Sequence, residues 1–222
     1  MVKKLLVLGD SFCHGIGTFK TVKHPDNTKH AFGKYLADYF QLEYVNLAEP
    51  GISVLKTAEI GYSYLKKHHN EVERVIIGWT VPGRLGIYSE NSALQILPSF
   101  VWLGDTANED LFVDYKNDVR FVTNKENKDY LPILPLLHRL IIENNFFDQT
   151  TSANTTIELF KTWLEKYNIV YDDFAVFGGY PDVKLSATFT KIMNFSGTTM
   201  TSKHPTVEEQ KLFADLLIKE LK

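Results

Sequence analysis

Hydrophobic and polar positions follow two different periods over the first third of the chain, and these periods predict strands and helices in turn. Short apolar runs, typical of strands buried in a parallel sheet, occur at 2–8, 44–47 and 72–79. Stripes with the spacing of amphipathic helices occur at 30–40 and 53–69, where Ser53 is the candidate N-cap. Strands that alternate with helices predict an α/β fold with a central parallel sheet and right-handed crossovers.

This pattern disappears between 82 and 129, where Gly, Pro, Asn, Asp and aromatic residues mix without a clear period. A segment of this length without regular structure is uncommon in a compact domain, so we interpret it as an insertion after the third strand. It would serve as a lid or as a partner surface, because aromatic side chains are favoured in interface cores. Its large aromatic residues include Tyr88, Phe100, Trp102, Phe112 and Tyr115.

Regular patterns return after the insertion and complete a single domain over 1–222. Asn154 or Thr155 is the candidate cap of a strongly amphipathic helix, and Pro205 is well placed in the first turn of the last helix. In chain order, the predicted elements are helix 130–147, helix 155–167, strand 169–177, an irregular stretch at 178–203 and helix 205–221.

Composition and charge narrow the class of protein. The 222 residues are 44% hydrophobic and 23% charged, which excludes a disordered chain, a collagen and a coiled coil. The net charge of −3 gives no electrostatic footprint for nucleic acid, and no apolar run is long enough to span a bilayer. The single cysteine excludes an internal disulfide framework, and the N-terminal apolar run is too short for a secretory signal, so we expect a cytoplasmic protein.

A serine follows the first predicted strand in the tripeptide Gly9-Asp10-Ser11. In an open parallel sheet, ligands bind at the carboxyl ends of the strands. The Ser11 hydroxyl would be exposed there, and its backbone N–H could serve an oxyanion in the same crevice. The alternative is an Asp-Ser turn that merely caps a helix, and position and tripeptide alone do not decide between the two.

Three further segments end at the same predicted edge or close to it. Gly51 follows the second strand and would let a backbone N–H approach a substrate, and Thr80 follows the third strand. His204 stands directly before the last predicted helix. Histidine is the usual base for a serine nucleophile. The plainer interpretations are a turn glycine, strand-end packing and a structural histidine. Arg84 either faces an anionic substrate group or lies on the surface.

In this order, the blocks Gly9-Asp10-Ser11, Gly51, Gly78-Trp79-Thr80 and His204-Pro205 resemble those of the SGNH (Gly-Asp-Ser-Leu) hydrolase family. The resemblance spans nearly the whole chain but rests on short blocks. It implies a three-layer, flavodoxin-like α/β fold. It also implies that Ser11 is the nucleophile and an oxyanion donor, that Gly51 is the second donor and that His204 is the general base.

Two blocks depart from the family pattern. The family has Gly-x-Asn-Asp in its third block, where this chain has Thr80 in place of the Asn that donates to the oxyanion. Loss of one such donor costs about 10²–10³ in rate. The family has Asp-x-x-His in its last block, where this chain has Thr201, which cannot supply the anion that orients the imidazole. A Ser-His dyad remains open, as does a carboxylate from Asp172, Asp173, Asp182 or Glu208.

The other titratable groups near Ser11 have plainer interpretations. Asp10 and His14 are candidates to line the site, and Cys13 as nucleophile would need a lowered pKa that nothing in the sequence indicates. No set of His, Cys, Asp or Glu residues has metal-ligand spacing, and Gly15-Ile16-Gly17 lacks the rest of a dinucleotide fingerprint. We therefore expect neither a metal nor a cofactor.

These observations lead to two main hypotheses of function. The first is a serine hydrolase that cleaves a small-molecule ester through an acyl-enzyme at Ser11. The second is a catalytically weakened binding or assembly protein that uses the 82–129 insertion as an interface to a protein partner or to a second copy of the chain, since a fold does not fix a function. A third alternative is an unrelated flavodoxin-like protein in which Ser11 binds a phosphate or a nucleotide.

Overall fold

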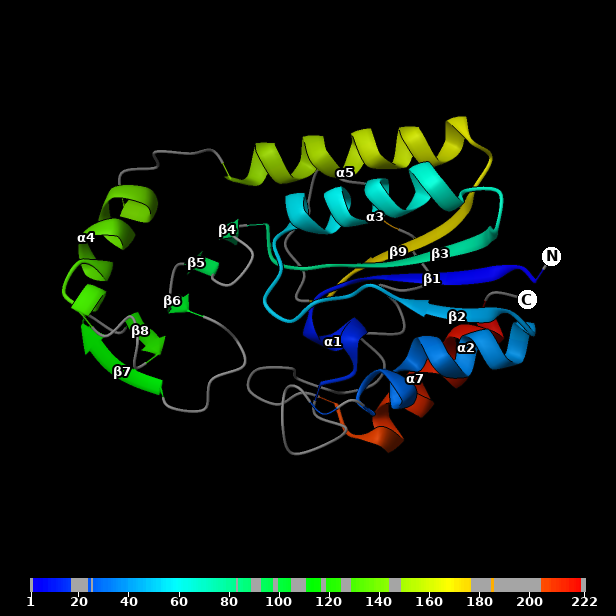
Figure 1. Ribbon diagram of the computed structural model, residues 1–222, viewed down its shortest axis with the longest axis horizontal. Coiled ribbons are helices and arrows are strands. Elements are labelled where there is room, and N and C mark those ends of the chain that lie inside the picture. Colours follow the sequence, from blue (N-terminus) through cyan, green and yellow to red (C-terminus); the bar gives the residue numbers. More distant parts are fainter. Residues whose placement is uncertain are drawn as a thin grey trace. The chain divides into compact units, whose positions relative to one another are not determined.

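The computed structural model describes residues 2–16, 24, 26–82, 84–88, 93–97, 100–104, 111–116, 119–124, 129–143, 149–176, 185 and 205–220. The chain forms two compact units (Figure 1). The first contains Met1–Pro82 and Asn154–Lys222, and the second contains Gly83–Ala153. The 82–129 segment identified from the sequence lies in the second unit, apart from Pro82.

A parallel four-stranded sheet forms the centre of the first unit. Its strands lie in the order β2-β1-β3-β9, and every neighbouring pair is parallel. Counted within this unit the order is 2-1-3-4, which is the order that flavodoxin-like folds share. The prediction of an α/β fold with a parallel sheet is therefore confirmed. The strands are β1 (Lys4–Gly9), β2 (Glu43–Asn46), β3 (Val72–Trp79) and β9 (Val170–Ala175).

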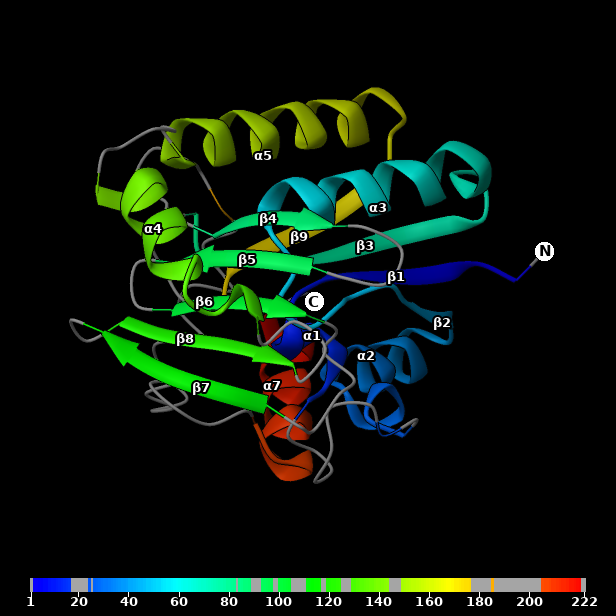
Figure 2. The same cartoon turned by 60° about the vertical axis from the view of Figure 1, so that its left-hand side comes forward.

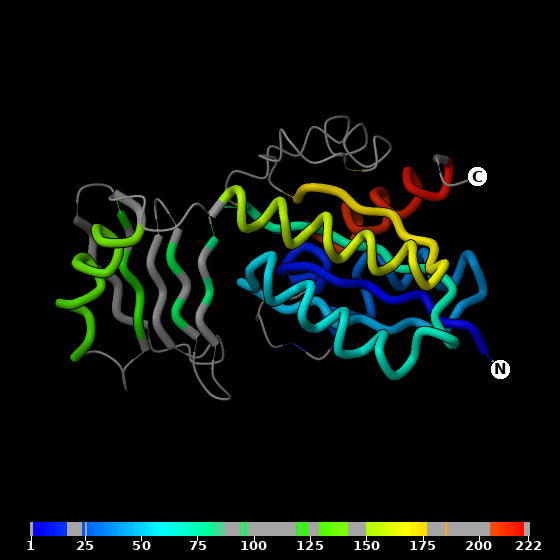
Figure 3. The backbone as a smooth tube through the Cα atoms, turned by 90° about the horizontal axis from the view of Figure 1, so that it is seen from above, coloured from blue at the N-terminus to red at the C-terminus, as the bar shows by residue number. Residues whose placement is uncertain are grey.

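Helices cover both faces of this sheet and give the unit three layers. On one face lie α2 (Phe32–Phe40) and α7 (Val207–Glu220), and on the other lie α3 (Val54–His68) and α5 (Gln149–Lys166) (Figure 1). Figure 3 shows α3 and α5 running side by side. Two short helical turns, α1 (Ser11–His14) and η1 (Thr28–His30), connect β1 to α2.

Four phenylalanines join the elements on the α2–α7 side into one core. Phe12 of α1, Phe32 of α2 and Phe213 of α7 contact one another with ring centroids 4.9–5.5 Å apart. Phe174 of β9 contacts all three at 5.5–6.0 Å. Edge-to-face aromatic pairs contribute about 0.5–1.5 kcal/mol each beyond the area they bury. This cluster therefore holds α1 against the C-terminal helix.

Two helix starts differ from the sequence prediction. The middle helix begins at Gln149 rather than at Asn154 or Thr155. Its first turn is polar and the buried stripe starts only at Ala153, so the apolar pattern gave no sign of that turn. The helix expected at 30–40 begins at Phe32, because His30 belongs to the separate turn η1.

The second unit contains a five-stranded sheet with the order β4-β5-β6-β8-β7 (Figure 2). All neighbours in it are antiparallel except β6 and β8. The helix α4 (Leu134–His138), followed by the π-helical turn η3 (Arg139–Glu143), packs Leu134 against Ile96 and Phe121 of the sheet. The strands are β4 (Leu85–Tyr88), β5 (Ala93–Leu97), β6 (Phe100–Gly104), β7 (Leu111–Lys116) and β8 (Val119–Asn124).

The sequence prediction of an irregular segment at 82–129 was wrong for these strands. Each has four to six residues, as β1, β2 and β9 have, but no helical stripe alternates with them, so the strand–helix pattern of the first unit is absent. The β6 sequence, Phe-Val-Trp-Leu-Gly, is apolar almost throughout and has no alternation to detect. The irregular stretch expected at 178–203 falls outside the described residues, apart from Leu185.

Gly33 lies inside α2, where glycine normally lowers helix stability, and close packing explains it. A Cβ at this position would lie 2.5 Å from Val7 Cγ2 and 3.0 Å from Tyr44 Cε2. The helix therefore rests directly on β1 and β2. Gly33→Ala would gain about 1 kcal/mol of helix propensity but lose about 1–3 kcal/mol through overpacking. We predict a net destabilisation, measured as a lower midpoint in urea-induced unfolding.

The matched control is Ser63→Ala, at an exposed position of α3. This change alters helix propensity without touching a neighbouring strand, so its unfolding midpoint should stay within about 0.5 kcal/mol of the wild type. A Gly33→Ala variant that is as stable as the wild type or more stable would contradict the close approach of α2 to the sheet.

Candidate active site

The carboxyl ends of β1 and β3 lie next to each other, and Ser11 follows directly from this edge. Gly9 is the register partner of Gly78, so Ser11 and Thr80 both lie two residues beyond the same pair. Asp10 separates β1 from α1, and Ser11 is the first residue of α1. Ser11 therefore lies at the edge at which parallel sheets bind ligands.

Asp10 fixes the start of this turn. Its Oδ1 atom accepts a hydrogen bond of 3.0 Å from the Phe12 N–H, and its side chain is fully buried. Asp10 is therefore an N-cap, a role in which a carboxylate is strongly preferred. The backbone N–H of Ser11 donates to no other described residue, and Ser11 is partly exposed. The turn thus presents an N–H and a hydroxyl on one residue.

Cys13 fills the space between two glycines below Ser11. A Cβ on Gly9 would lie 2.6 Å from Cys13 Sγ, and one on Gly78 would lie closer still. Gly9 also has a φ of 143°, a value that side-chain-bearing residues rarely adopt. Both glycines are therefore required for the chain to turn from β1 into α1 at this point.

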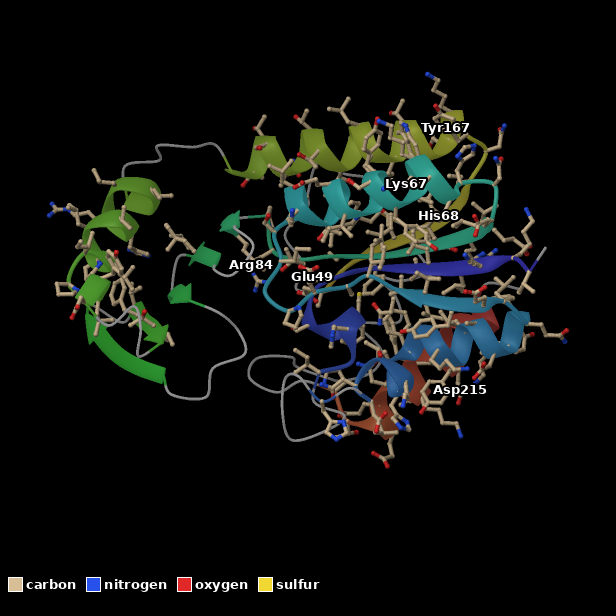
Figure 4. All side chains as sticks on the ribbon, in the orientation of Figure 1. Glu49, Lys67, His68, Arg84, Tyr167 and Asp215 are labelled. Carbon is tan, nitrogen blue, oxygen red and sulfur yellow. The ribbon has the colours of Figure 1, made fainter. Side chains whose placement is uncertain are left out.

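The loop after β2 is hydrogen-bonded to the same edge. The Leu47 N–H donates to Val7 O at 2.9 Å, and the Glu49 N–H donates to Gly9 O at 2.9 Å. Gly51 follows two residues later with a φ of 74°, in the left-handed region that favours glycine. Figure 4 shows Glu49 at the end of the sheet where α1 lies. The loop that carries Gly51 is therefore anchored to the residue two positions before Ser11.

Asn46 is a positioning residue that the sequence analysis missed. Its Nδ2 atom donates to Cys13 O at 3.0 Å, and its Oδ1 atom accepts from the Ala48 N–H at 2.9 Å. It also donates to the Tyr44 hydroxyl at 2.7 Å. One side chain thus joins the end of α1 to the loop after β2. Its only signal in the sequence is a polar residue at a strand end, which many strands share.

Thr80 directly follows β3 and is buried, with 1% of its surface exposed. Next to it, the Val176 N–H donates to Trp79 O at 2.9 Å, which extends the pairing of β3 and β9 to this edge. A hydroxyl placed here could donate only into an enclosed part of the site. This burial limits how freely Thr80 could replace the longer amide of an asparagine.

Burial shifts the pKa values of two neighbours of Ser11. Burial raises the pKa of the Cys13 thiol well above its usual range, and the charge of Asp10 adds to this effect against two nearby backbone N–H groups. The thiol is therefore protonated at neutral pH. Burial also lowers the pKa of His14, whose ring is partly exposed at the end of α1. His14 is therefore neutral over most of the physiological range.

The candidate carboxylates for the missing Asp differ in their surroundings. Asp173 is buried on β9, accepts a hydrogen bond of 3.0 Å from Trp79 Nε1 and lies 3.8 Å from Lys161 Nζ. Burial raises the pKa of Asp172, although Arg74 at 3.7 Å opposes the shift. Glu208 is exposed in the first turn of α7. Asp182 lies outside the described part of the chain.

Three predicted site residues stay predictions, because the described structure does not relate them to Ser11. His204 and Thr201 lie in the undescribed stretch that ends just before Pro205. Arg84 belongs to the second unit, where it stands directly before β4.

Two other histidines lie at the opposite end of the sheet from Ser11. His68 Nδ1 is 3.1 Å from Glu71 Oε1 near the start of β3, and the His69 ring lies 5.3 Å from the Tyr167 ring. Figure 4 shows His68 and Tyr167 at the end of the first unit away from Glu49. These histidines therefore cannot act as the base for Ser11.

A search of the described residues finds no group of three or more His, Cys, Asp or Glu side chains that could hold a metal ion. Within the same residues, no helix has the length and apolar character needed to cross a membrane.

Comparisons with protein families and with curated proteins find no match. Three similar solved structures have low identity and TM-score. A protein described as lipolytic and of the G-D-S-L family, from Desulfitobacterium hafniense DCB-2, has 15% identity, a TM-score of 0.37 and 98% coverage of each chain. The esterase EstA from Pseudoalteromonas sp. has 11% identity and a TM-score of 0.49, with 99% of this chain and 96% of that chain covered. The acetyl xylan esterase Est2A from Butyrivibrio proteoclasticus has 12% identity and a TM-score of 0.47, with 99% and 63% covered. Likeness at this level carries no argument about activity.

The surroundings of Cys13 predict that this thiol is chemically inert in the folded protein. Native protein at pH 8 should not react with a thiol-exchange reagent over an hour, whereas guanidinium-unfolded protein should react at one site within minutes. Because folding raises the pKa of this acid, its contribution to stability is complete below the unfolded pKa of about 8.5 and is lost as the pH rises above it. Rapid labelling of the native thiol would overturn this description of the turn.

Proposed function

We propose that this protein is a serine hydrolase that cleaves ester or acyl bonds with Ser11 as its nucleophile. The observation that carries the proposal is the turn from β1 into α1. Ser11 lies at the carboxyl edge of a parallel sheet with its N–H unbonded among the described residues, and the loop with Gly51 is hydrogen-bonded to Gly9. A hydroxyl and a backbone N–H on one residue at such an edge suit acyl transfer, in which a developing oxyanion must be stabilised.

The reaction then follows from the residue types. Ser11 Oγ attacks the carbonyl carbon of the ester while His204 accepts the hydroxyl proton. The Ser11 N–H and the Gly51 N–H stabilise the negative oxygen of the tetrahedral intermediate, with Thr80 as a third donor. When the intermediate collapses, the alcohol leaves with the proton from His204 and an acyl-enzyme remains. Water, deprotonated by His204, hydrolyses this ester and restores the Ser11 hydroxyl.

The pair Ser11 and His204 would work without the usual aspartate, because Thr201 stands where the family has Asp. Asp173 already binds Trp79 and lies near Lys161 within the sheet layer, so we do not assign it this role. A dyad without an anionic partner stabilises the imidazolium less well, which reduces the rate but leaves the mechanism intact. We expect a modest turnover on activated esters with small acyl groups.

The direct test is hydrolysis of p-nitrophenyl acetate by three variants. Ser11→Ala and His204→Ala should each lower kcat by about 10³-fold or more, because each removes a group that acts in bond formation. Ser63→Ala, at an exposed serine of α3, is the matched control and should keep the wild-type rate. Circular dichroism should show the same fold for all of them.

Wild-type hydrolysis that survives in Ser11→Ala would contradict the assignment of the nucleophile. A wild-type protein with no activity on any short activated ester, and no labelling by a serine-directed phosphonate, would contradict the hydrolase proposal as a whole.

A second candidate function, assembly through the second unit, is favoured by one observation. The α4–η3 segment packs one side on its sheet but leaves Leu136 and Leu140 exposed, as is Ile133 directly before it, and Leu136 is 57% exposed. Apolar side chains gathered in this way mark interaction surfaces. These residues follow the 82–129 segment, which the sequence analysis interprets as a lid or a partner surface.

If this surface joins two copies of the chain, the double variant Leu136→Lys and Leu140→Lys should be monomeric at concentrations where the wild type is a dimer. Sedimentation velocity measures both species. A monomeric wild type over the same concentrations would count against self-assembly.

A further inference from the structure

A buried glutamine of the C-terminal helix binds the backbone next to Ser11. Gln210 of α7 has no exposed surface. Its Nε2 atom donates to Phe12 O at 3.1 Å, and its Oε1 atom accepts from the Phe32 N–H at 2.9 Å. Burial of an amide is unfavourable unless its polar atoms are paired, and here both ends are. One side chain therefore connects three helical segments that are far apart in the sequence.

The two hydrogen-bond partners of Gln210 show what its side chain stabilises. Phe32 begins α2, and its N-cap Ala31 has no side chain that could satisfy the first N–H groups of the helix. The Gln210 amide oxygen takes over this capping role from another helix. Phe12 follows Ser11 in α1, so the bond to its carbonyl oxygen holds the peptide between Phe12 and Cys13, one residue beyond the candidate nucleophile.

Hydrogen bonds also hold the start of α7. The Glu209 side chain accepts a 2.7 Å hydrogen bond from the Thr206 N–H, and the Thr206 hydroxyl accepts one of 3.3 Å from the Glu209 N–H. This reciprocal pair is a capping box. Gln210 itself donates from its backbone to Thr206 O at 2.9 Å, one helical turn away. His204 is only two residues before Thr206 in the sequence.

We propose that Gln210 is a positioning residue that sets the separation between the turn carrying Ser11 and the helix start that follows His204. This inference rests on the proposed hydrolase function. Gln210 touches neither substrate nor reacting atoms in this account. It holds the two segments so that a base on the one can reach the hydroxyl on the other.

The reason is geometric. A general base must come within about 2.6–3.2 Å of the atom whose proton it takes, and a shift of about 1 Å can cost 10²-fold in rate. Ser11 and His204 belong to different ends of the chain. Among the described residues, Gln210 is the side chain that hydrogen-bonds α7 directly to α1. Its bonds therefore fix the separation of α1 and α7, on which the approach of His204 to Ser11 would depend in the proposed reaction.

A purely structural role makes a different prediction. The phenylalanine cluster also holds α7 to α1, through Phe213 and Phe12, and it would persist without the glutamine. Gln210→Met keeps the length of the side chain but removes both hydrogen bonds. If Gln210 positions the site, this variant should stay folded and lose rate. If it only stabilises the fold, the variant should lose stability and keep its rate while folded.

The experiment measures p-nitrophenyl acetate hydrolysis and the rate of Ser11 labelling by a fluorophosphonate, below the melting temperature of every variant. For Gln210→Met we expect kcat and the labelling rate to fall about tenfold to hundredfold, with KM within about twofold of the wild type. The control is Leu217→Ala, two turns along the same helix at a fully buried position. It should lower the melting temperature but leave kcat and the labelling rate unchanged.

A second variant controls for effects that come from the methionine side chain itself rather than from the lost hydrogen bonds. Gln210→Leu also removes both hydrogen bonds, but with a branched side chain that packs differently from methionine. It should therefore lose rate as Gln210→Met does. Folded variants that keep the wild-type kcat and labelling rate would overturn the proposal. It would also fall if both variants fail to fold, or if Leu217→Ala loses rate to the same extent. A wild type that the phosphonate does not label would instead overturn the hydrolase proposal itself.

Discussion

The close contact of Cys13 with Gly9 and Gly78 is the constraint on which the candidate site depends. The two glycines face each other across β1 and β3, and the absence of their side chains leaves room for the sulfur. This packing lets the chain leave β1 and enter α1 within two residues. A side chain at either glycine position would push α1 away from the edge. The exposed position of Ser11 thus follows from three small residues below it.

Segments from three parts of the chain meet at this edge by hydrogen bonds to backbone atoms. Asn46 and Glu49 bring the loop after β2 to Cys13 and Gly9. Gln210 brings the C-terminal helix to Phe12. These hydrogen bonds fix the backbone of the segments relative to one another, as a site for proton transfer requires. In this account the fold contributes alignment, and the reacting groups are few.

The sequence predicted those features that depend on local pattern. These features are the four parallel strands, the N-cap Ser53 and the turn at Ser11. They could be predicted because each apolar run and the polar residues that end it are adjacent in the sequence. The roles of Gln210 and Asn46 were not readable, because each depends on partners brought close only by folding. The five short strands of the second unit were missed for another reason, because Gly, Pro, Asn and Asp residues interrupt this segment repeatedly and no helical pattern alternates with its strands. The positions of Thr201 and His204 stay predictions, because both lie outside the described residues.

The central claim is that Ser11 and Gly51 direct their N–H groups at one oxygen while His204 serves the Ser11 hydroxyl. A crystal structure of the protein after reaction with a small phosphonate tests this arrangement most directly, because the adduct resembles the tetrahedral intermediate. We expect phosphorus bonded to Ser11 Oγ, a phosphoryl oxygen within about 3.1 Å of both N–H groups and His204 within hydrogen-bond distance of Oγ. An adduct on another residue, or a His204 ring far from Ser11, would contradict it.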